Sequence, residues 1–177
     1  MATEFETKVL DIDVPGILDK LKKLGAEDKT DMMMRRFVFD INPEKNEWIR
    51  LRDDGKKVTL TYKNRTGSEI GSTEEIEVKV SGFDDTAKIL KRLPFKGVFY
   101  QENRRKLFLL QDCEVSIDSW PRIPPYLEIE GDSKEQVTAC LSLLNLEGDD
   151  EGDISVVEVY KRYGIDLHSM TDLRFKK

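Results

Sequence analysis

The chain has 177 residues, of which 38% are hydrophobic and 36% charged, and its formal net charge at pH 7 is -6. One domain spanning residues 1–177 is predicted, because a chain of this length buries a core without disulfides or a structural metal. The acidic balance argues against a nucleic-acid partner, since duplex binding requires a basic surface. No stretch approaches the roughly 18 apolar residues of a membrane span, so a cytoplasmic protein without a membrane partner is expected.

Alternation of charged and apolar residues predicts a series of β-strands, of which residues 4–9 form the first. Residues two apart in a strand share a face, so Glu4, Glu6 and Lys8 lie together on one side of this segment. The same split recurs along the chain, with charged or polar faces formed by Arg50 and Arg52; Thr59, Thr61 and Lys63; Glu75, Glu77 and Lys79; Glu114, Ser116 and Asp118; and Glu128 and Glu130.

Helices are predicted between the strands, where apolar residues recur at helical spacing. Four segments show this spacing, at residues 14–24, 84–93, 133–146 and 153–163. The dipeptide Asp54-Gly55 separates two strand patterns and predicts a hairpin turn. The acidic segment 147–153 lacks the spacing of a calcium loop and is predicted to be a mobile loop.

Charged strand faces ordinarily point to water, and this explanation suffices for any single strand. Here the charged faces repeat acids and bases in pairs two residues apart, in proportions that suit a shared interior. The predicted fold is therefore α+β, a closed antiparallel β barrel with helices packed outside and a charged tunnel inside. Such a tunnel must be wet, internally paired or filled by an ion-rich ligand. Polyphosphate with a divalent metal would satisfy both signs of charge.

The order of these motifs resembles the CYTH superfamily, the triphosphate tunnel metalloenzymes, which includes class IV adenylate cyclases, thiamine triphosphatases and inorganic triphosphatases. The resemblance runs through most of the chain and implies a closed antiparallel eight-stranded β barrel. It is carried by ExExK (Glu4, Glu6 and Lys8), RxR (Arg50 and Arg52), Lys63, ExE (Glu75 and Glu77), Arg105, Asp118, and a closing ExE (Glu128 and Glu130). Two departures leave the subfamily open: VVEVYKRYGID replaces an SYxxLL-like segment, and Asn103 stands where some cyclases carry the lysine of KxR.

The resemblance implies a role for each motif residue in binding a small-molecule triphosphate and its metal. It implies that the basic residues bind the phosphates: Lys8, Arg50, Arg52, Lys63 and Arg105. It implies that Mg²⁺ or Mn²⁺ is held by acids among Glu4, Glu6, Glu75, Glu77, Asp118, Glu128 and Glu130. The residues expected to be catalytic are Glu4, Glu6, Lys8 and Asp118.

Three functions are compatible with these residues. Hydrolysis of inorganic, thiamine or nucleoside triphosphate is expected first, because it asks least of the site. A class IV adenylate cyclase also requires adenine recognition, for which no residue is evident. A non-catalytic polyphosphate or nucleotide binding module would not need the acids. The oligomeric state is left open, a homodimer included, as is which of Arg35 and Arg36 faces the tunnel.

Overall fold

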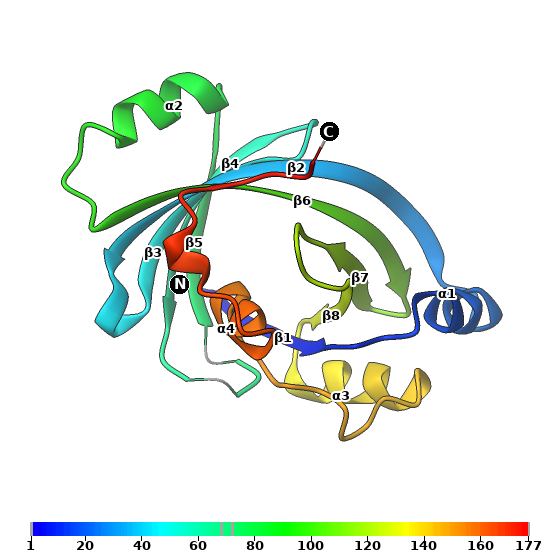
Figure 1. Ribbon diagram of the computed structural model, residues 1–177. Coiled ribbons are helices and arrows are strands. Elements are labelled where there is room, and N and C mark those ends of the chain that lie inside the picture. The colour runs from blue at the N-terminus through cyan, green and yellow to red at the C-terminus, as the bar shows by residue number, and fades with distance from the viewer. Residues whose placement is uncertain (1, 68, 72, 177) are drawn as a thin grey trace.

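The computed structural model describes residues 2–67, 69–71 and 73–176, and describes residues 2–4 by their backbone alone. The fold is α+β, and eight strands form one curled antiparallel sheet (Figure 1), which confirms the predicted α+β class and the antiparallel pairing of eight strands. The eight strands are β1 (Ala2–Val9), β2 (Glu27–Asn42), β3 (Glu47–Asp53), β4 (Val58–Arg65), β5 (Thr73–Val80), β6 (Gly97–Leu110), β7 (Cys113–Ser119) and β8 (Tyr126–Gly131).

Hydrogen-bonded neighbours follow the order β2-β3-β4-β5-β1-β8-β7-β6, and β2 also pairs with β6. A short strand, β9 (Asp172–Leu173), adds to β6 in parallel. Strand β1 divides its pairing: residues 2–4 face β5, and residues 5–9 face β8. On the edge of β1 that faces β5, the pairing with β5 does not reach Lys8. There a loop residue pairs with the strand instead: the Gly152 carbonyl accepts a 3.2 Å hydrogen bond from the Lys8 amide.

The helices of the described residues lie around this sheet, with two short 3-10 turns. They are α1 (Val14–Lys23), α2 (Phe83–Leu90), α3 (Lys134–Leu143), α4 (Val156–Arg162), η1 (Pro43–Lys45) and η2 (Leu167–Ser169). The Ser133 side chain accepts a hydrogen bond from the Gln136 amide and so caps the start of α3. The fourth helix begins at Val156, three residues later than predicted.

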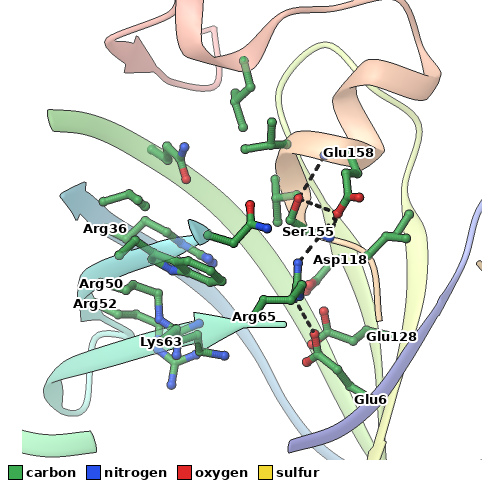
Figure 2. Close-up of a pocket in the computed structure, with 18 of the residues that line it drawn as sticks. Glu6, Arg36, Arg50, Arg52, Lys63, Arg65, Asp118, Glu128, Ser155 and Glu158 are labelled. Carbon is green, nitrogen blue, oxygen red and sulfur yellow. Dashed lines mark hydrogen bonds and ion pairs between the residues drawn. The ribbon is translucent and has the colours of Figure 1, made fainter. Parts of the chain in front are cut away.

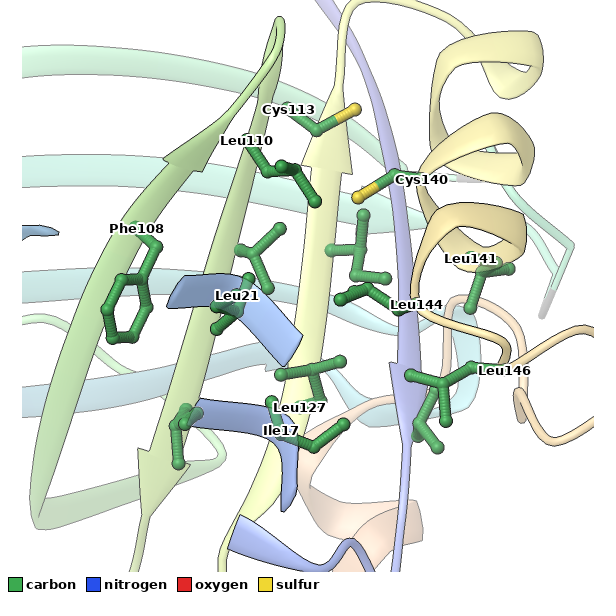
Figure 3. Packing of buried hydrophobic residues seen from close by; sticks show 14 of the residues in the cluster. Ile17, Leu21, Phe108, Leu110, Cys113, Leu127, Cys140, Leu141, Leu144 and Leu146 are labelled. Atoms are coloured by element: carbon green, nitrogen blue, oxygen red, sulfur yellow. The ribbon is translucent and has the colours of Figure 1, made fainter. Parts of the chain in front are cut away.

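Most of the apolar core lies on the outer face of the sheet, beneath the helices, and a part of it around Trp120 and Tyr126 borders the interior. Figure 3 shows Ile17 and Leu21 of α1, Cys140 of α3 and Leu127 of β8 in one buried cluster. A second cluster lies under α2, and a third joins Trp120 to α4 and η2. Because these apolar faces are covered by helices, the opposite, charged faces point to the interior of the curled sheet.

Strand β5 departs from the prediction that helices cover the apolar outer face. Ile76 and Val78 are each 52% exposed. Among the described residues, no helix has the length and apolar composition needed to cross a membrane.

Candidate active site

A cavity of about 460 Å³ lies inside the curled sheet. Every predicted site residue whose side chain is described lines it: Glu6, Lys8, Arg50, Arg52, Lys63, Glu75, Glu77, Arg105, Asp118, Glu128 and Glu130. The backbone of Glu4 lies in β1 opposite Thr73, and its side chain is outside what the structure describes. The cavity is therefore where strand parity places the charged residues.

Strand register brings residues that are distant in sequence together in this cavity. Across β1 and β8, Lys8 lies opposite Glu128 and Glu6 opposite Glu130. Across β4 and β5, Lys63 lies opposite Glu75. Figure 2 shows the result: the side chains of β3 and β4 face those of β1, β7 and β8 across the cavity.

Three glutamates form an acidic group on one side of the cavity. One carboxylate oxygen from each of Glu6, Glu128 and Glu130 lies within 4.8 Å of the others. Lys8 Nζ lies 2.7 Å from Glu6 Oε1 and 3.4 Å from Glu128 Oε2, and the Lys8 side chain is 2% exposed. A buried ammonium between two carboxylates partly neutralises this acidic group.

The acids of this group differ in their affinity for protons. Burial pushes the pKa of Glu6 upward, but the charges of Lys8 and Lys63 outweigh it and hold that pKa well below its ordinary value. Burial and the charges of Glu128 and Glu6 raise the pKa of Glu130 to about 7. In the absence of a cation, Glu130 is therefore the acid of this group that most readily takes a proton near neutral pH.

Arg105 is fixed by two acids. Its Nε and Nη2 atoms donate to the two oxygens of Asp118 at 2.8 and 2.6 Å, and Nη2 also donates to Glu128 at 2.6 Å. The Asp118 side chain is 1% exposed, and both its oxygens are engaged by the guanidinium. This geometry suits Asp118 to orienting Arg105, and Asp118 is not one of the three clustered glutamates.

The opposite wall of the cavity is basic. Glu77 lies 3.9 Å from Arg50 and 3.7 Å from Arg52, and Lys63 lies 3.5 Å from Glu75. The charge of Arg50, together with burial, lowers the pKa of Arg52 to about 10. Glu75 and Glu77 thus pair with cations on this wall and lie apart from the acidic group.

Two residues of the site were missed by the sequence analysis, Arg65 and Asp153. Arg65 ends β4 and shares the parity of Thr61 and Lys63, so extending the strand pattern by two residues would have found it. Asp153 is fully buried, and its carboxylate accepts from Arg65 Nη2 at 2.8 Å and from the Thr73 hydroxyl at 2.7 Å.

These contacts show that the predicted mobile loop is wrong at its C-terminal end. Residues 151 and 152 hydrogen bond to the backbone of Lys8. Ser155 and Glu158 then form a capping box that starts α4 beside the cavity. Because Ser155 is the N-cap, α4 begins at Val156, and Asp153 lies before the helix. The acidic and glycine-rich sequence around Asp153 carries no periodic signal of this role.

The structure also resolves the ambiguity between Arg35 and Arg36. Arg36 lines the cavity and is 7% exposed, whereas the Arg35 side chain is 41% exposed and pairs with Asp53. Arg36 lies opposite Arg52 in the β2–β3 register.

Comparison with known proteins points in the same direction as the site. The model of the CYTH domain family matches residues 2–149. A protein of Methanocaldococcus jannaschii named as a candidate adenylate cyclase is 32% identical over 136 residues, which cover 72% of this chain and 75% of that protein.

Solved structures share the fold. A protein of Pyrococcus horikoshii has a TM-score of 0.75 at 22% identity, covering 88% of this chain and 98% of that one. A Hippeastrum protein, described as a candidate adenylyl cyclase with a dominant triphosphatase activity, has a TM-score of 0.53 at 15% identity. The latter match covers 93% of this chain and 96% of that one.

Proposed function

The chain belongs to the CYTH domain family, and from this premise we propose that it is a metal-dependent hydrolase of inorganic, thiamine or nucleoside triphosphate. One observation carries the proposal: a single cavity joins a cluster of carboxylates to a wall of arginine and lysine side chains. A triphosphate with a divalent cation is a ligand that needs both signs of charge at once.

The proposal includes closure of the curled sheet into a tunnel around the substrate. Support comes from the pairing of β2 with β6, which links the two ends of the eight-strand order. A second support is α4, whose first turn lines the cavity although residues 150–177 lie beyond the family match. We therefore treat residues 1–177 as one functional domain.

The residues present fit a divalent cation. Glu6, Glu128 and Glu130 bring three carboxylate oxygens close together, and hard oxygen ligands suit Mg²⁺ or Mn²⁺. When bound, such an ion would neutralise phosphate charge and lower the pKa of a water molecule. Glu75 and Glu77, which were also predicted to be metal ligands, are assigned instead to holding Lys63, Arg50 and Arg52 in place.

The basic residues have the task of binding and orienting the triphosphate. Arg50 and Arg52 present guanidinium groups that match phosphate oxygens, and Lys63 adds a point charge. Lys8 and Arg105 each contact Glu128 of the acidic group, and Asp118 fixes the direction of Arg105. In hydrolysis, the oxygen of water bonds to the terminal phosphorus while the bridging P–O bond breaks. Catalysis is then mainly positioning and charge neutralisation.

An alternative is cyclisation of ATP to cyclic AMP and pyrophosphate, which the name of the Methanocaldococcus jannaschii relative favours. The description of the Hippeastrum protein, with its dominant triphosphatase activity, favours hydrolysis. A non-catalytic polyphosphate or nucleotide binding module is disfavoured, because binding alone does not require three clustered carboxylates.

The experiment that tests this proposal is product identification by ³¹P NMR. The protein is incubated with tripolyphosphate, thiamine triphosphate or ATP, each with Mg²⁺ or Mn²⁺. Hydrolysis predicts orthophosphate and the matching diphosphate from at least one substrate, and no turnover in EDTA. Cyclic AMP with pyrophosphate would establish the cyclase, and the absence of turnover with all three would leave the binding module.

A further inference from the structure

Arg36 is a buried guanidinium with few partners. It is 7% exposed, and its Nη2 atom donates to Asn103 Oδ1. Its Cζ atom lies 4.6 Å from the centre of the Trp120 ring. Its Nε atom has no hydrogen-bond partner, and within the described part of the chain no carboxylate forms an ion pair with it. A buried charge in this state is costly unless a ligand completes it.

Other polar groups around Arg36 also lack partners. Three buried atoms make no hydrogen bond to any residue that the structure describes: Asn103 Nδ2, Trp120 Nε1 and Tyr126 Oη. Asn103 and Trp120 both contact Arg36, and Trp120 and Tyr126 line the same cavity as Arg36. Asn103 Nδ2 and Trp120 Nε1 can only donate, and the tyrosine hydroxyl can donate. This end of the cavity therefore offers hydrogen-bond donors that call for an acceptor.

The surrounding charges identify the acceptor as an anion. Arg36 lies opposite Arg52 across the β2–β3 pair, and burial together with the charges of Arg50 and Arg52 lowers the pKa of Arg36 to about 9. Asp118 is the acid that counters this effect, but both its oxygens are engaged by Arg105. The positive charges of Arg36, Arg50 and Arg52 are therefore not fully neutralised by neighbouring acids, and an anion would stabilise them.

We propose that Arg36, with the donors of Asn103, Trp120 and Tyr126, forms an oxyanion subsite that binds a phosphoryl group beyond the Arg50 and Arg52 clamp. This proposal rests on the proposed function, because the phosphoryl group is taken to be the end phosphate of a bound triphosphate. Free orthophosphate carries the same chemical group and could occupy the same subsite. The fork of guanidinium donors fits phosphate oxygens, and in the absence of an anion Arg36 stays stacked against Trp120.

The test is calorimetric titration of tripolyphosphate and of orthophosphate into the protein in EDTA. Arg36→Gln should weaken tripolyphosphate binding about tenfold or more, which is the loss of roughly one charge-assisted hydrogen bond. Arg35→Gln is the matched control, because it removes the same charge from the neighbouring position on the outer face of β2. Binding by this control should stay within about twofold of wild type.

The orthophosphate titration separates the two sources. Orthophosphate binding that also depends on Arg36 supports a subsite open to free phosphate, and dependence for tripolyphosphate alone supports a subsite for the end of the chain. Equal affinity of Arg36→Gln and wild type for tripolyphosphate would overturn the proposal, as would an equal loss in Arg35→Gln. If Arg36→Gln does not fold, Arg36→Lys keeps the charge without the fork, and wild-type affinity in that variant would overturn the proposal.

Binding in EDTA also keeps this proposal distinct from the hydrolase. A wild-type protein that binds tripolyphosphate through Arg36 but turns over no substrate would retain the subsite and refute the hydrolase. A wild-type protein that turns over substrate, with tripolyphosphate binding that does not depend on Arg36, would refute the subsite and retain the hydrolase.

Discussion

Asp153 and Arg65 form a buried ion pair, with Arg65 Nη2 2.8 Å from Asp153 Oδ1. The pair joins the segment after α3 to the end of β4, and Arg65 Nη2 lies 3.7 Å from Glu6 in the acidic group. Asp153 lies outside residues 2–149, which match the family. The C-terminal segment therefore completes one wall of the cavity.

Replacing Asp153 should be strongly destabilising. Asp153→Ala leaves Arg65 buried without its nearest acid and removes the acceptor of the Thr73 hydroxyl, so the free energy of unfolding should fall by about 3 kcal/mol. Urea denaturation measures the change. Asp149→Ala, at an exposed position of the same acidic segment, should stay within about 0.5 kcal/mol of wild type. A similar fall in the free energy of unfolding in both variants would show that the buried ion pair does not stabilise the fold more than an exposed acid does.

The raised pKa of Glu130 predicts a pH-dependent stability in EDTA. The folded protein holds the Glu130 proton up to about pH 7, above the ordinary value near 4.5, so this group contributes stability at low pH that is lost as pH rises through 7. Glu130→Gln cannot lose this proton. Its free energy of unfolding should therefore exceed that of wild type by about 2 kcal/mol at pH 8 and by less at pH 5.

Urea denaturation at the two pH values checks the Glu130 prediction. Glu147→Gln, at an exposed position, should give the same small difference from wild type at both. A Glu130→Gln variant whose advantage does not grow with pH would contradict the assigned proton affinity.

Glutamates of the acidic group and glutamates of the basic wall should differ in how much they contribute to the affinity for a divalent cation. Glu6 belongs to the three-carboxylate group, whereas Glu75 pairs with Lys63 on the opposite wall. Glu6→Gln should therefore weaken Mn²⁺ binding at least tenfold, and Glu75→Gln should change it by less than about threefold. Electron paramagnetic resonance of free Mn²⁺ gives both affinities. An equal loss in the two variants would place the cation between the walls.

Asp118 is predicted to act through Arg105. Asp118→Asn keeps the shape of the side chain but weakens both hydrogen bonds that fix the guanidinium, so kcat/KM should fall about 10- to 100-fold. Mn²⁺ affinity should be unchanged, because Asp118 is outside the acidic group. A loss of Mn²⁺ binding in Asp118→Asn would instead make this residue a metal ligand.

Strand parity predicted which side chains share the interior, because a period of two follows directly from residue order. Parity also extended to Arg65, which the sequence analysis did not use. The sequence could not predict which glutamates join the acidic group and which pair with the basic wall. Glu6 and Glu75 occur in the same ExExK motif, but the residue on the neighbouring strand is Glu130 for Glu6 and Lys63 for Glu75.

Other features depended on distant contacts. Asp153 acquires its position from Arg65 and Thr73, far away in sequence. Ile76 and Val78 show the apolar alternation of a covered strand face, yet each is 52% exposed. Parity gives the face on which a residue lies, but it does not say what covers that face.

Hydrolysis in ¹⁸O-labelled water tests the central claim most directly. Tripolyphosphate is incubated with the protein and Mn²⁺, and the products are examined by ³¹P NMR and mass spectrometry. Attack of water on the terminal phosphorus predicts one ¹⁸O atom in orthophosphate and none in pyrophosphate, with no label transferred in EDTA. Label in pyrophosphate alone would contradict attack on the terminal phosphorus. No labelled product from tripolyphosphate, thiamine triphosphate or ATP would contradict a metal-dependent triphosphate hydrolase.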